Sequence, residues 1–136
     1  MRDDADLTNA ARSVFGGQLR GLFAFWARVR GDARPDSDLD VAVWLYGPLR
    51  RSSTWIPWCT HFHAAEPTID PTFFTATTLA HPSGWLLEAV HGGTRVLYDP
   101  SGELHERLAA IQEDLRTGRQ QRRLFMGLPY YEAART

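Results

Sequence analysis

The segment "DLDVAVWL", residues 38–45, constrains the fold most, because polar and apolar residues alternate through its first half. Residues two apart share one face of a β-strand. Asp38 and Asp40 are therefore expected on one face, and the opposite face is expected to enter a core through Leu39, Val41, Val43 and Leu45. Two carboxylates side by side repel each other unless a cation lies between them. The pattern predicts a buried strand with an acidic pair at its start.

The acidic pair has two interpretations. In the first, Asp36, Ser37 and Asp38 form a solvated turn before the strand, which is common for a motif as short as Asp-x-Asp. In the second, the carboxylates bind a divalent metal. Carboxylate oxygens on a rigid strand, with room for waters and phosphate oxygens, suit Mg²⁺ or Mn²⁺. The arginine-rich loop before the strand favours the second, because it offers positive charge to a phosphate.

The composition narrows the class of protein. The chain has 136 residues, 43% of them hydrophobic and 23% charged, which predicts a globular domain with one core. The net charge of -1 gives no reason to expect a nucleic-acid partner. Cys59 is the only cysteine, so the chain cannot form an internal disulfide or a cysteine zinc site. The polar start "MRDDADLTNA" and the lack of an apolar run of about 20 residues predict a cytoplasmic protein without a membrane span.

Periodicity predicts an alternation of helices and strands. Helices are expected over residues 6–17, 49–67 and 83–93, and strands over residues 19–26, 38–45, 68–77 and 94–99. Pro71 points to a sheet edge or a bend. A last helix is expected after Asp99 and Pro100, with an apolar stripe formed by Leu104, Leu108, Ile111 and Leu115. The expected fold class is α+β, with a mixed β-sheet, helices mainly on one face and a C-terminal helix.

The stretch "FWARVRGDARPDSDLDVAV" resembles the signature of the nucleotidyltransferase superfamily that includes DNA polymerase β, and most of all its small bacterial minimal nucleotidyltransferases. Their pattern runs Phe-Gly-Ser, an Ala/Arg/Gly-rich turn and Ser-Asp-x-Asp on the next strand. "EPTIDPTFF" is similar to the segment that carries the family's third carboxylate, here Asp70. The resemblance runs in order over about residues 8–100. The residues in register are Arg28, Arg30, Gly31, Asp32, Arg34, Pro35, Ser37, Asp38 and Asp40.

The resemblance implies a metal-dependent transfer of a nucleoside monophosphate, AMP, from ATP to a hydroxyl group. In such enzymes three carboxylates hold Mg²⁺ or Mn²⁺, which corresponds to Asp38, Asp40 and Asp70 here. Asp70 is also the candidate catalytic base. The candidate nucleotide-binding residues are Arg28, Arg30 and Ser37. The resemblance also implies a nucleotidyltransferase-like domain over residues 1–100, with residues 101–136 as a C-terminal helical extension of the same domain.

The sequence departs from the family's pattern where Trp26 and Ala27 replace Gly-Ser. The glycine lets a phosphate approach the backbone, and the serine hydroxyl gives it a hydrogen bond. Trp26 adds a bulky indole, and Ala27 removes a hydrogen bond to a charged group that is worth roughly 1.5–3 kcal/mol. An alternative is that Trp26 simply ends the preceding strand and packs into the core. The departure raises a second hypothesis, a nucleotidyltransferase fold without turnover.

Three functions follow from these observations. The first is a nucleotidyltransferase of the antitoxin type, acting on a partner of the helical nuclease family called HEPN. The second is a catalytically degenerate pseudoenzyme that binds such a partner or forms a homodimer through the apolar stripe of its C-terminal helix. The third and weakest is an RNA-binding module that uses Arg116, Arg119, Arg122 and Arg123.

Overall fold

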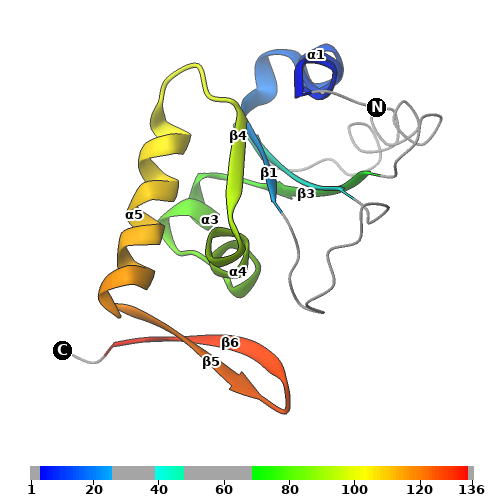
Figure 1. The fold of residues 1–136 in the computed structure, drawn as a ribbon. Helices are drawn as coiled ribbons and strands as arrows, with labels where there is room; N and C mark the ends of the chain where they lie inside the picture. The colour runs from blue at the N-terminus through cyan, green and yellow to red at the C-terminus, as the bar shows by residue number, and fades with distance from the viewer. Residues whose placement is uncertain (1–3, 26–38, 48–68, 135–136) are drawn as a thin grey trace.

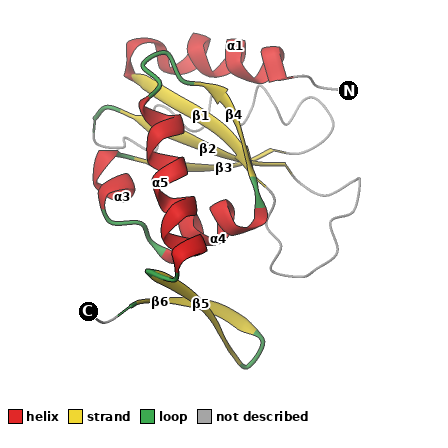
Figure 2. Cartoon of the chain, turned by 60° about the vertical axis from the view of Figure 1, so that its left-hand side comes forward, coloured by secondary structure: helices red, strands yellow, loops and turns green. Residues whose placement is uncertain are grey.

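The computed structural model describes residues 4–25, 39–47 and 69–134. Within these ranges the chain forms a four-stranded sheet with helices against it and a separate two-stranded hairpin (Figures 1 and 2). This arrangement confirms the α+β class. The helix expected over residues 49–67 lies outside the described residues. The elements are α1 (Asp4–Phe15), η1 (Gly16–Gln18), β1 (Leu19–Phe25), β2 (Leu39–Leu45), β3 (Ile69–Phe74), α3 (Ala76–Ala80), α4 (Gly84–Gly92), β4 (Thr94–Tyr98), α5 (Glu103–Thr117), β5 (Gln120–Phe125) and β6 (Leu128–Ala133).

The larger sheet has the strand order β3-β2-β1-β4. β1 pairs antiparallel with β2 and β4, whereas β2 and β3 run parallel. The sheet is therefore mixed, as expected. Pro71 lies in β3, at an edge of this sheet. A proline has no N–H to donate to a further strand, so the edge tolerates it.

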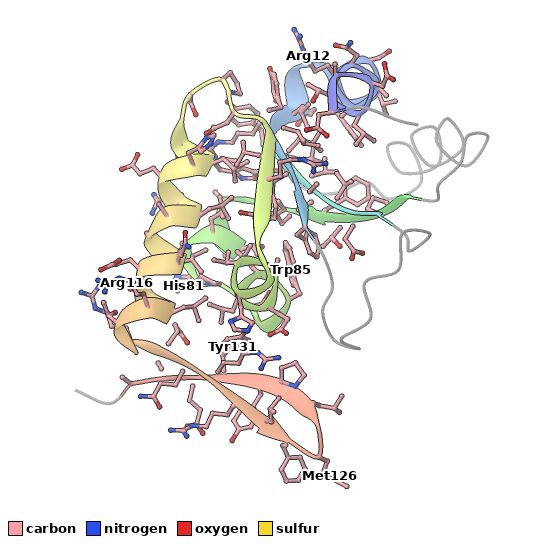
Figure 3. All side chains as sticks on the ribbon, in the orientation of Figure 1. Arg12, His81, Trp85, Arg116, Met126 and Tyr131 are labelled. Atoms are coloured by element: carbon pink, nitrogen blue, oxygen red, sulfur yellow. The ribbon has the colours of Figure 1, made fainter. Side chains whose placement is uncertain are left out.

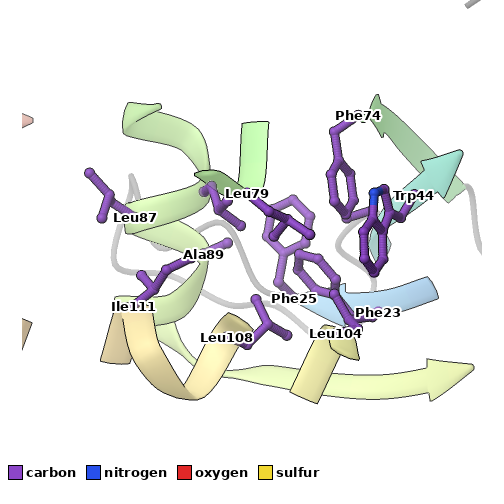
Figure 4. Close-up of a cluster of buried hydrophobic side chains, with 12 residues drawn as sticks. Phe23, Phe25, Trp44, Phe74, Leu79, Leu87, Ala89, Leu104, Leu108 and Ile111 are labelled. Carbon is purple, nitrogen blue, oxygen red and sulfur yellow. The ribbon is translucent and has the colours of Figure 1, made fainter. Parts of the chain in front are cut away.

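Both faces of the sheet are buried, which differs from the single core face expected for β2. α1 covers one face, where its residues Leu7, Ala11 and Phe15 pack with Val41 and Val43. α3, α4 and α5 cover the other face, where Figure 4 shows side chains from all three helices against the sheet. The residues of this second core include Phe23, Phe25, Ala42, Trp44, Phe74, Leu79, Leu86, Leu104, Leu108 and Ile111.

The second core changes the interpretation of the Asp40 face. Ala42 and Trp44 alternate with the same period as Asp40, and they are 0% and 1% exposed. β2 is an inner strand, and inner strands covered by helices on both sides are apolar throughout. Asp40 itself is half-buried. It therefore lies at the start of a buried row rather than on a solvated face.

α5 packs on the second face through the stripe seen in the sequence. Leu104, Leu108 and Ile111 are buried, and Leu115 packs at the margin of the same core. The carboxylate of Asp99 accepts hydrogen bonds from the backbone N–H groups of Leu104 and His105, at 3.1 and 2.9 Å, which satisfies two of the helix's first N–H groups. The stripe that suggested a homodimer surface is thus covered by the chain's own sheet.

Gly21 explains how closely α5 approaches the sheet. A Cβ at this position would lie 3.0 Å from both Leu104 Cδ2 and Trp44 Cε3. These distances are shorter than ordinary van der Waals contacts, so only glycine leaves room for both side chains. In addition, Arg20 joins the start of α5 to β1, because it donates a hydrogen bond of 2.7 Å to Glu103.

The C-terminal region is helical only as far as Thr117, whereas a helical extension was expected over residues 101–136. Gly118 follows with a φ of 82°, a conformation that ends a helix and that glycine adopts freely. β5 and β6 then form an antiparallel hairpin that projects away from the sheet and helices (Figure 1). Within the described residues, no helix is long and apolar enough to cross a membrane.

Candidate functional site

The pairing of β2 with β3 brings two predicted metal ligands to the same level of the sheet. The Cα atom of Asp40 is in register with the Cα atom of Asp70 on the neighbouring parallel strand. Adjacent strands lie about 4.8 Å apart, so the two backbones are neighbours although 30 positions separate them in the chain. Both residues are second in their strands. The beginnings of β2 and β3 therefore form an acidic edge, which we define by Asp40 and Asp70.

The other predicted site residues lie outside the described ranges. Asp38 directly precedes β2, and the candidate nucleotide-binding residues and both departing positions fall in the segment between β1 and β2. No three metal-binding side chains gather among the side chains that the structure describes. At this site the structure therefore shows that the backbones of Asp40 and Asp70, two of the three predicted carboxylate residues, are in register. The residues outside the described ranges are Trp26, Ala27, Arg28, Arg30, Ser37 and Asp38.

Aromatic packing borders the acidic edge on its β1 side. Phe25 is in register with Asp40 across β1 and β2 and is 8% exposed. Its ring centroid lies 6.0 Å from that of Trp85 in α4, and Trp85 in turn meets Phe74 of β3 edge to face at 5.7 Å. Aromatic contacts at such distances add to apolar burial. They connect β1, α4 and β3, with Phe25 at the level of Asp40 and Phe74 at the level of Trp44 near the other end of β2.

A second carboxylate cluster joins α4 to the hairpin. Glu88 in α4 is 8% exposed, and its two oxygens accept hydrogen bonds of 3.0 and 2.9 Å from Arg122 of β5. The phenol of Tyr131 in β6 donates a further hydrogen bond to Glu88. A buried carboxylate is tolerated when it has an opposite charge and further hydrogen bonds. We call Glu88, Arg122 and Tyr131 the anchor cluster, because they fix both hairpin strands to α4.

The charges of the anchor cluster shift its protonation equilibria. The hydrogen bond from Arg122 lowers the pKa of Glu88, against the opposing effect of burial and with the help of Tyr131. Burial raises the pKa of Tyr131, and its hydrogen bond to Glu88 raises it further. At neutral pH, Glu88 is therefore ionised and the Tyr131 phenol is protonated. These are the states that the observed hydrogen bonds require.

The sequence analysis missed this cluster. Glu88 stands in "WLLEAVH", where an acidic residue interrupts an otherwise apolar run. Because α4 packs on the sheet and also contacts the hairpin, residues 86–89 in the middle of that run are buried. The acidic residue within this apolar run was thus the sign of the cluster in the sequence, because a buried carboxylate requires a partner. Its partners, however, lie 34 and 43 positions away and could not be read from local sequence.

The four arginines of the RNA-binding hypothesis are paired within the chain. Arg116 pairs with Glu113, Arg119 with Asp114, Arg122 with Glu88, and Arg123 with Glu132. Each positive charge is thus offset by a neighbouring carboxylate. This pairing weakens the argument for a basic surface that attracts RNA.

Comparisons with known proteins reveal the fold. No protein-family model and no curated protein sequence matches the chain. Three solved structures illustrate the structural matches. A toxin-antitoxin with AMP-PNP matches with a TM-score of 0.56 and 15% identity, over 87% of this chain and 90% of that chain. A variant of the toxin-antitoxin MntA-HpeT, with two Asp-to-Glu substitutions two positions apart, gives 0.56 and 13% over the same shares.

The third is a tri-AMPylated HEPN toxin from Shewanella oneidensis in complex with an MNT antitoxin. It matches with a TM-score of 0.51 and 12% identity, over 85% of this chain and 88% of that chain. At these identities the likeness concerns architecture. The chain has a nucleotidyltransferase-type fold, which it shares with a chain in each of these toxin-antitoxin structures.

Proposed function

We propose that this protein is an antitoxin-type nucleotidyltransferase that transfers AMP from ATP to a hydroxyl group of a HEPN-type partner. The observation that carries the proposal is the register of Asp40 with Asp70 at the beginnings of two parallel strands. Asp38 comes one position before β2 in the sequence, and the proposal assigns it to the same site. That the same fold occurs in a complex with an AMPylated HEPN toxin supports the choice of nucleotide and partner.

The donor set fits a hard divalent cation. Carboxylates on adjacent strands repel each other, and a cation between them removes the repulsion. Their oxygens are the ligands that Mg²⁺ and Mn²⁺ prefer, so Asp38, Asp40 and Asp70 would hold the metal. When bound, the metal would neutralise charge on the phosphate oxygens. One structural neighbour is a variant with two Asp-to-Glu substitutions. The two substituted aspartates lie two positions apart, as Asp38 and Asp40 do here.

The protein residues would position the reactants and handle one proton. The acceptor oxygen forms a bond to the α-phosphorus of ATP. The bond from that phosphorus to the bridging oxygen breaks, and pyrophosphate leaves with the electron pair. Asp70 takes the acceptor's proton and passes it to solvent. Arg28, Arg30 and Ser37 would contact the phosphates, because their side chains donate charge-assisted or hydroxyl hydrogen bonds.

A second candidate function is a pseudoenzyme of the same fold that binds the partner without transferring AMP. The replacement of Gly-Ser by Trp26 and Ala27 favours it, because the phosphate loses a serine hydroxyl and meets an indole. Both candidates predict a HEPN-type partner. They differ in whether ATP binds and whether AMP is transferred.

Calorimetric titration with ATP and Mg²⁺ or Mn²⁺ separates the two candidates. For the enzyme, wild type binds ATP, Asp40→Asn weakens binding by about tenfold or more, and the exposed Asp114→Asn control leaves it unchanged. For the pseudoenzyme, wild type does not bind, and the double variant Trp26→Gly/Ala27→Ser does. Mass spectrometry of a co-expressed HEPN-type protein then detects added AMP. Binding that is unaffected by Asp40→Asn would contradict the assigned site.

A further inference from the structure

The tip of the β5–β6 hairpin exposes large apolar side chains to solvent. Leu124, Phe125, Met126 and Leu128 are 60%, 68%, 87% and 63% exposed, and they surround the turn between the two strands. Figure 3 shows Met126 at the far end of the hairpin, while Tyr131 points back toward α4. Side chains of this size carry roughly 150–200 Å² each, so the four together expose roughly 400–550 Å². Exposed apolar patches of that area commonly mark binding sites.

The turn itself shows that Met126 is placed against backbone preference. Met126 and Gly127 have φ angles of 53° and 82°, which are those of a two-residue turn with both central residues left-handed. Such turns favour Asn-Gly, and an unbranched apolar residue at the first position costs stability. A strained residue whose side chain is almost fully exposed gains nothing from packing within the chain. The strained backbone and the exposure of Met126 together point to a contact outside the chain.

The hairpin is held in a fixed direction. The anchor cluster attaches β5 through Arg122 and β6 through Tyr131 to the same buried Glu88. A charged cluster is a costly way to attach a surface hairpin, since apolar residues could pack at equal or lower free energy. Its benefit is a defined geometry, because each hydrogen bond specifies direction. An oriented hairpin presents its tip as a preorganised anchor.

We propose that this apolar tip, formed by Leu124, Phe125, Met126 and Leu128, is the surface that docks the HEPN-type partner by inserting into an apolar cleft of that helical protein. The inference rests on the proposed function for the identity of the partner. The tip carries no charged side chain, so its complement is apolar. Methionine suits such a contact, because its side chain adapts its shape to a cleft.

Two features of the hairpin argue against a second copy of the chain as the occupant. Two tips packed on each other would bury at most roughly 800–1,100 Å² in total, which is less than the roughly 1,200–2,000 Å² of a stable interface. The strands also carry ionised side chains, among them the exposed Arg123–Glu132 pair. Charges along a strand oppose edge-to-edge pairing with another hairpin. A cleft, by contrast, can enclose the tip from several sides.

The test uses a variant that removes the tip without harming the fold. Met126→Asn replaces an apolar side chain with the residue that the turn prefers, and Phe125→Thr keeps a strand-forming residue. The matched control is Tyr46→Thr, because Tyr46 is 63% exposed but lies beside Gln18, far from the hairpin in the chain. Variants of the chain are co-expressed with a HEPN-type protein. Affinity is then measured by calorimetry, and self-association by sedimentation.

We expect Phe125→Thr/Met126→Asn to bind the HEPN-type protein at least tenfold more weakly than wild type, with an unchanged or higher Tm, and Tyr46→Thr to bind like wild type. If wild type binds and the double variant binds equally well, the docking assignment is wrong while the proposed function stands. If wild type does not bind the HEPN-type protein, the proposed partner and the proposed occupant are both wrong. If wild type instead forms dimers that the double variant loses, the occupant is a second copy and the proposal is overturned.

Discussion

The acidic edge and the anchor cluster are two solutions to the problem of placing carboxylates inside a small fold. Glu88 has its counter-charge within the chain, in a bidentate contact with Arg122. Asp40 is in register with another aspartate. A carboxylate matched with an arginine serves the architecture, whereas the proposed function gives two aspartates at one level of the sheet the role of holding a cation. Sequence neighbours do not distinguish the two kinds of acid, but the residue placed opposite in the fold does.

The largest expected loss of stability comes from replacing Glu88, the acid that is paired with an arginine. Glu88→Ala leaves Arg122 without its counter-charge and Tyr131 without its acceptor. Breaking a buried pair costs 3–5 kcal/mol, and because the Arg122 side chain is 29% exposed we expect about 3 kcal/mol, or a drop in Tm of roughly 10 °C. Urea unfolding measures the loss. Glu113→Ala, which removes an exposed partner of Arg116, is the control and should change Tm little.

The second effect concerns the proposed binding of a cation at the acidic edge. Mn²⁺ at 100 times its Kd should stabilise wild type by about 2.7 kcal/mol, because only the folded state presents the acidic edge. Asp40→Asn should remove this gain, while Glu88→Gln should unfold earlier but keep it. Thermal unfolding with and without Mn²⁺ measures both. A gain that survives Asp40→Asn but disappears in Glu88→Gln would reverse the two roles.

The sequence predicted what local periodicity determines. The strand through Val41 and Val43 and the apolar stripe of α5 were both read correctly, since each depends on neighbours within a few residues. That β2 is buried on both faces was not predicted, because the inner position of a strand is decided by which distant strands pair with it. The hairpin was missed because its turn is Met-Gly, which lacks the Asn-Gly signal of such turns.

For the candidate site, the chemistry of the residues was more predictable than their arrangement. The resemblance assigned Asp70 as the third carboxylate, and the register of β3 with β2 is consistent with that assignment. No local pattern could give this register, because it depends on how a separate strand joins the sheet. Glu88 illustrates the converse. Its burial was hinted at by an apolar run, but its partners come from a hairpin beyond α5.

A third prediction concerns how the contribution of Glu88 to the free energy of unfolding depends on pH. The pKa of Glu88 is lowered on folding, chiefly by the hydrogen bond from Arg122. The unfolded chain therefore binds the proton first as pH falls, so the contribution of the charge is present above the ordinary value of 4.5 and is lost below it. The difference in unfolding free energy between wild type and Glu88→Gln should be constant from pH 7 to 5 and shrink below about 4.5. A difference that grows in acid would contradict this sign.

The smallest expected loss of stability concerns Asp99, whose carboxylate is stabilised differently from those of the anchor cluster and the acidic edge. Asp99 is buried, which alone would raise its pKa, but the N–H groups of His105 and Leu104 and the His105 ring lower it overall. Its carboxylate is matched by backbone donors at the start of α5 rather than by an arginine or a metal. Asp99→Ala should therefore cost about 1 kcal/mol, the usual value of a helix cap, and leave the Mn²⁺ gain intact. Asp99→Asn, which keeps one acceptor oxygen, should cost less. Asp99→Ala could instead destabilise the protein as much as Glu88→Ala does. In that case a helix cap and a buried ion pair would contribute equally to stability. The contrast between the anchor cluster and the acidic edge would then have no energetic basis.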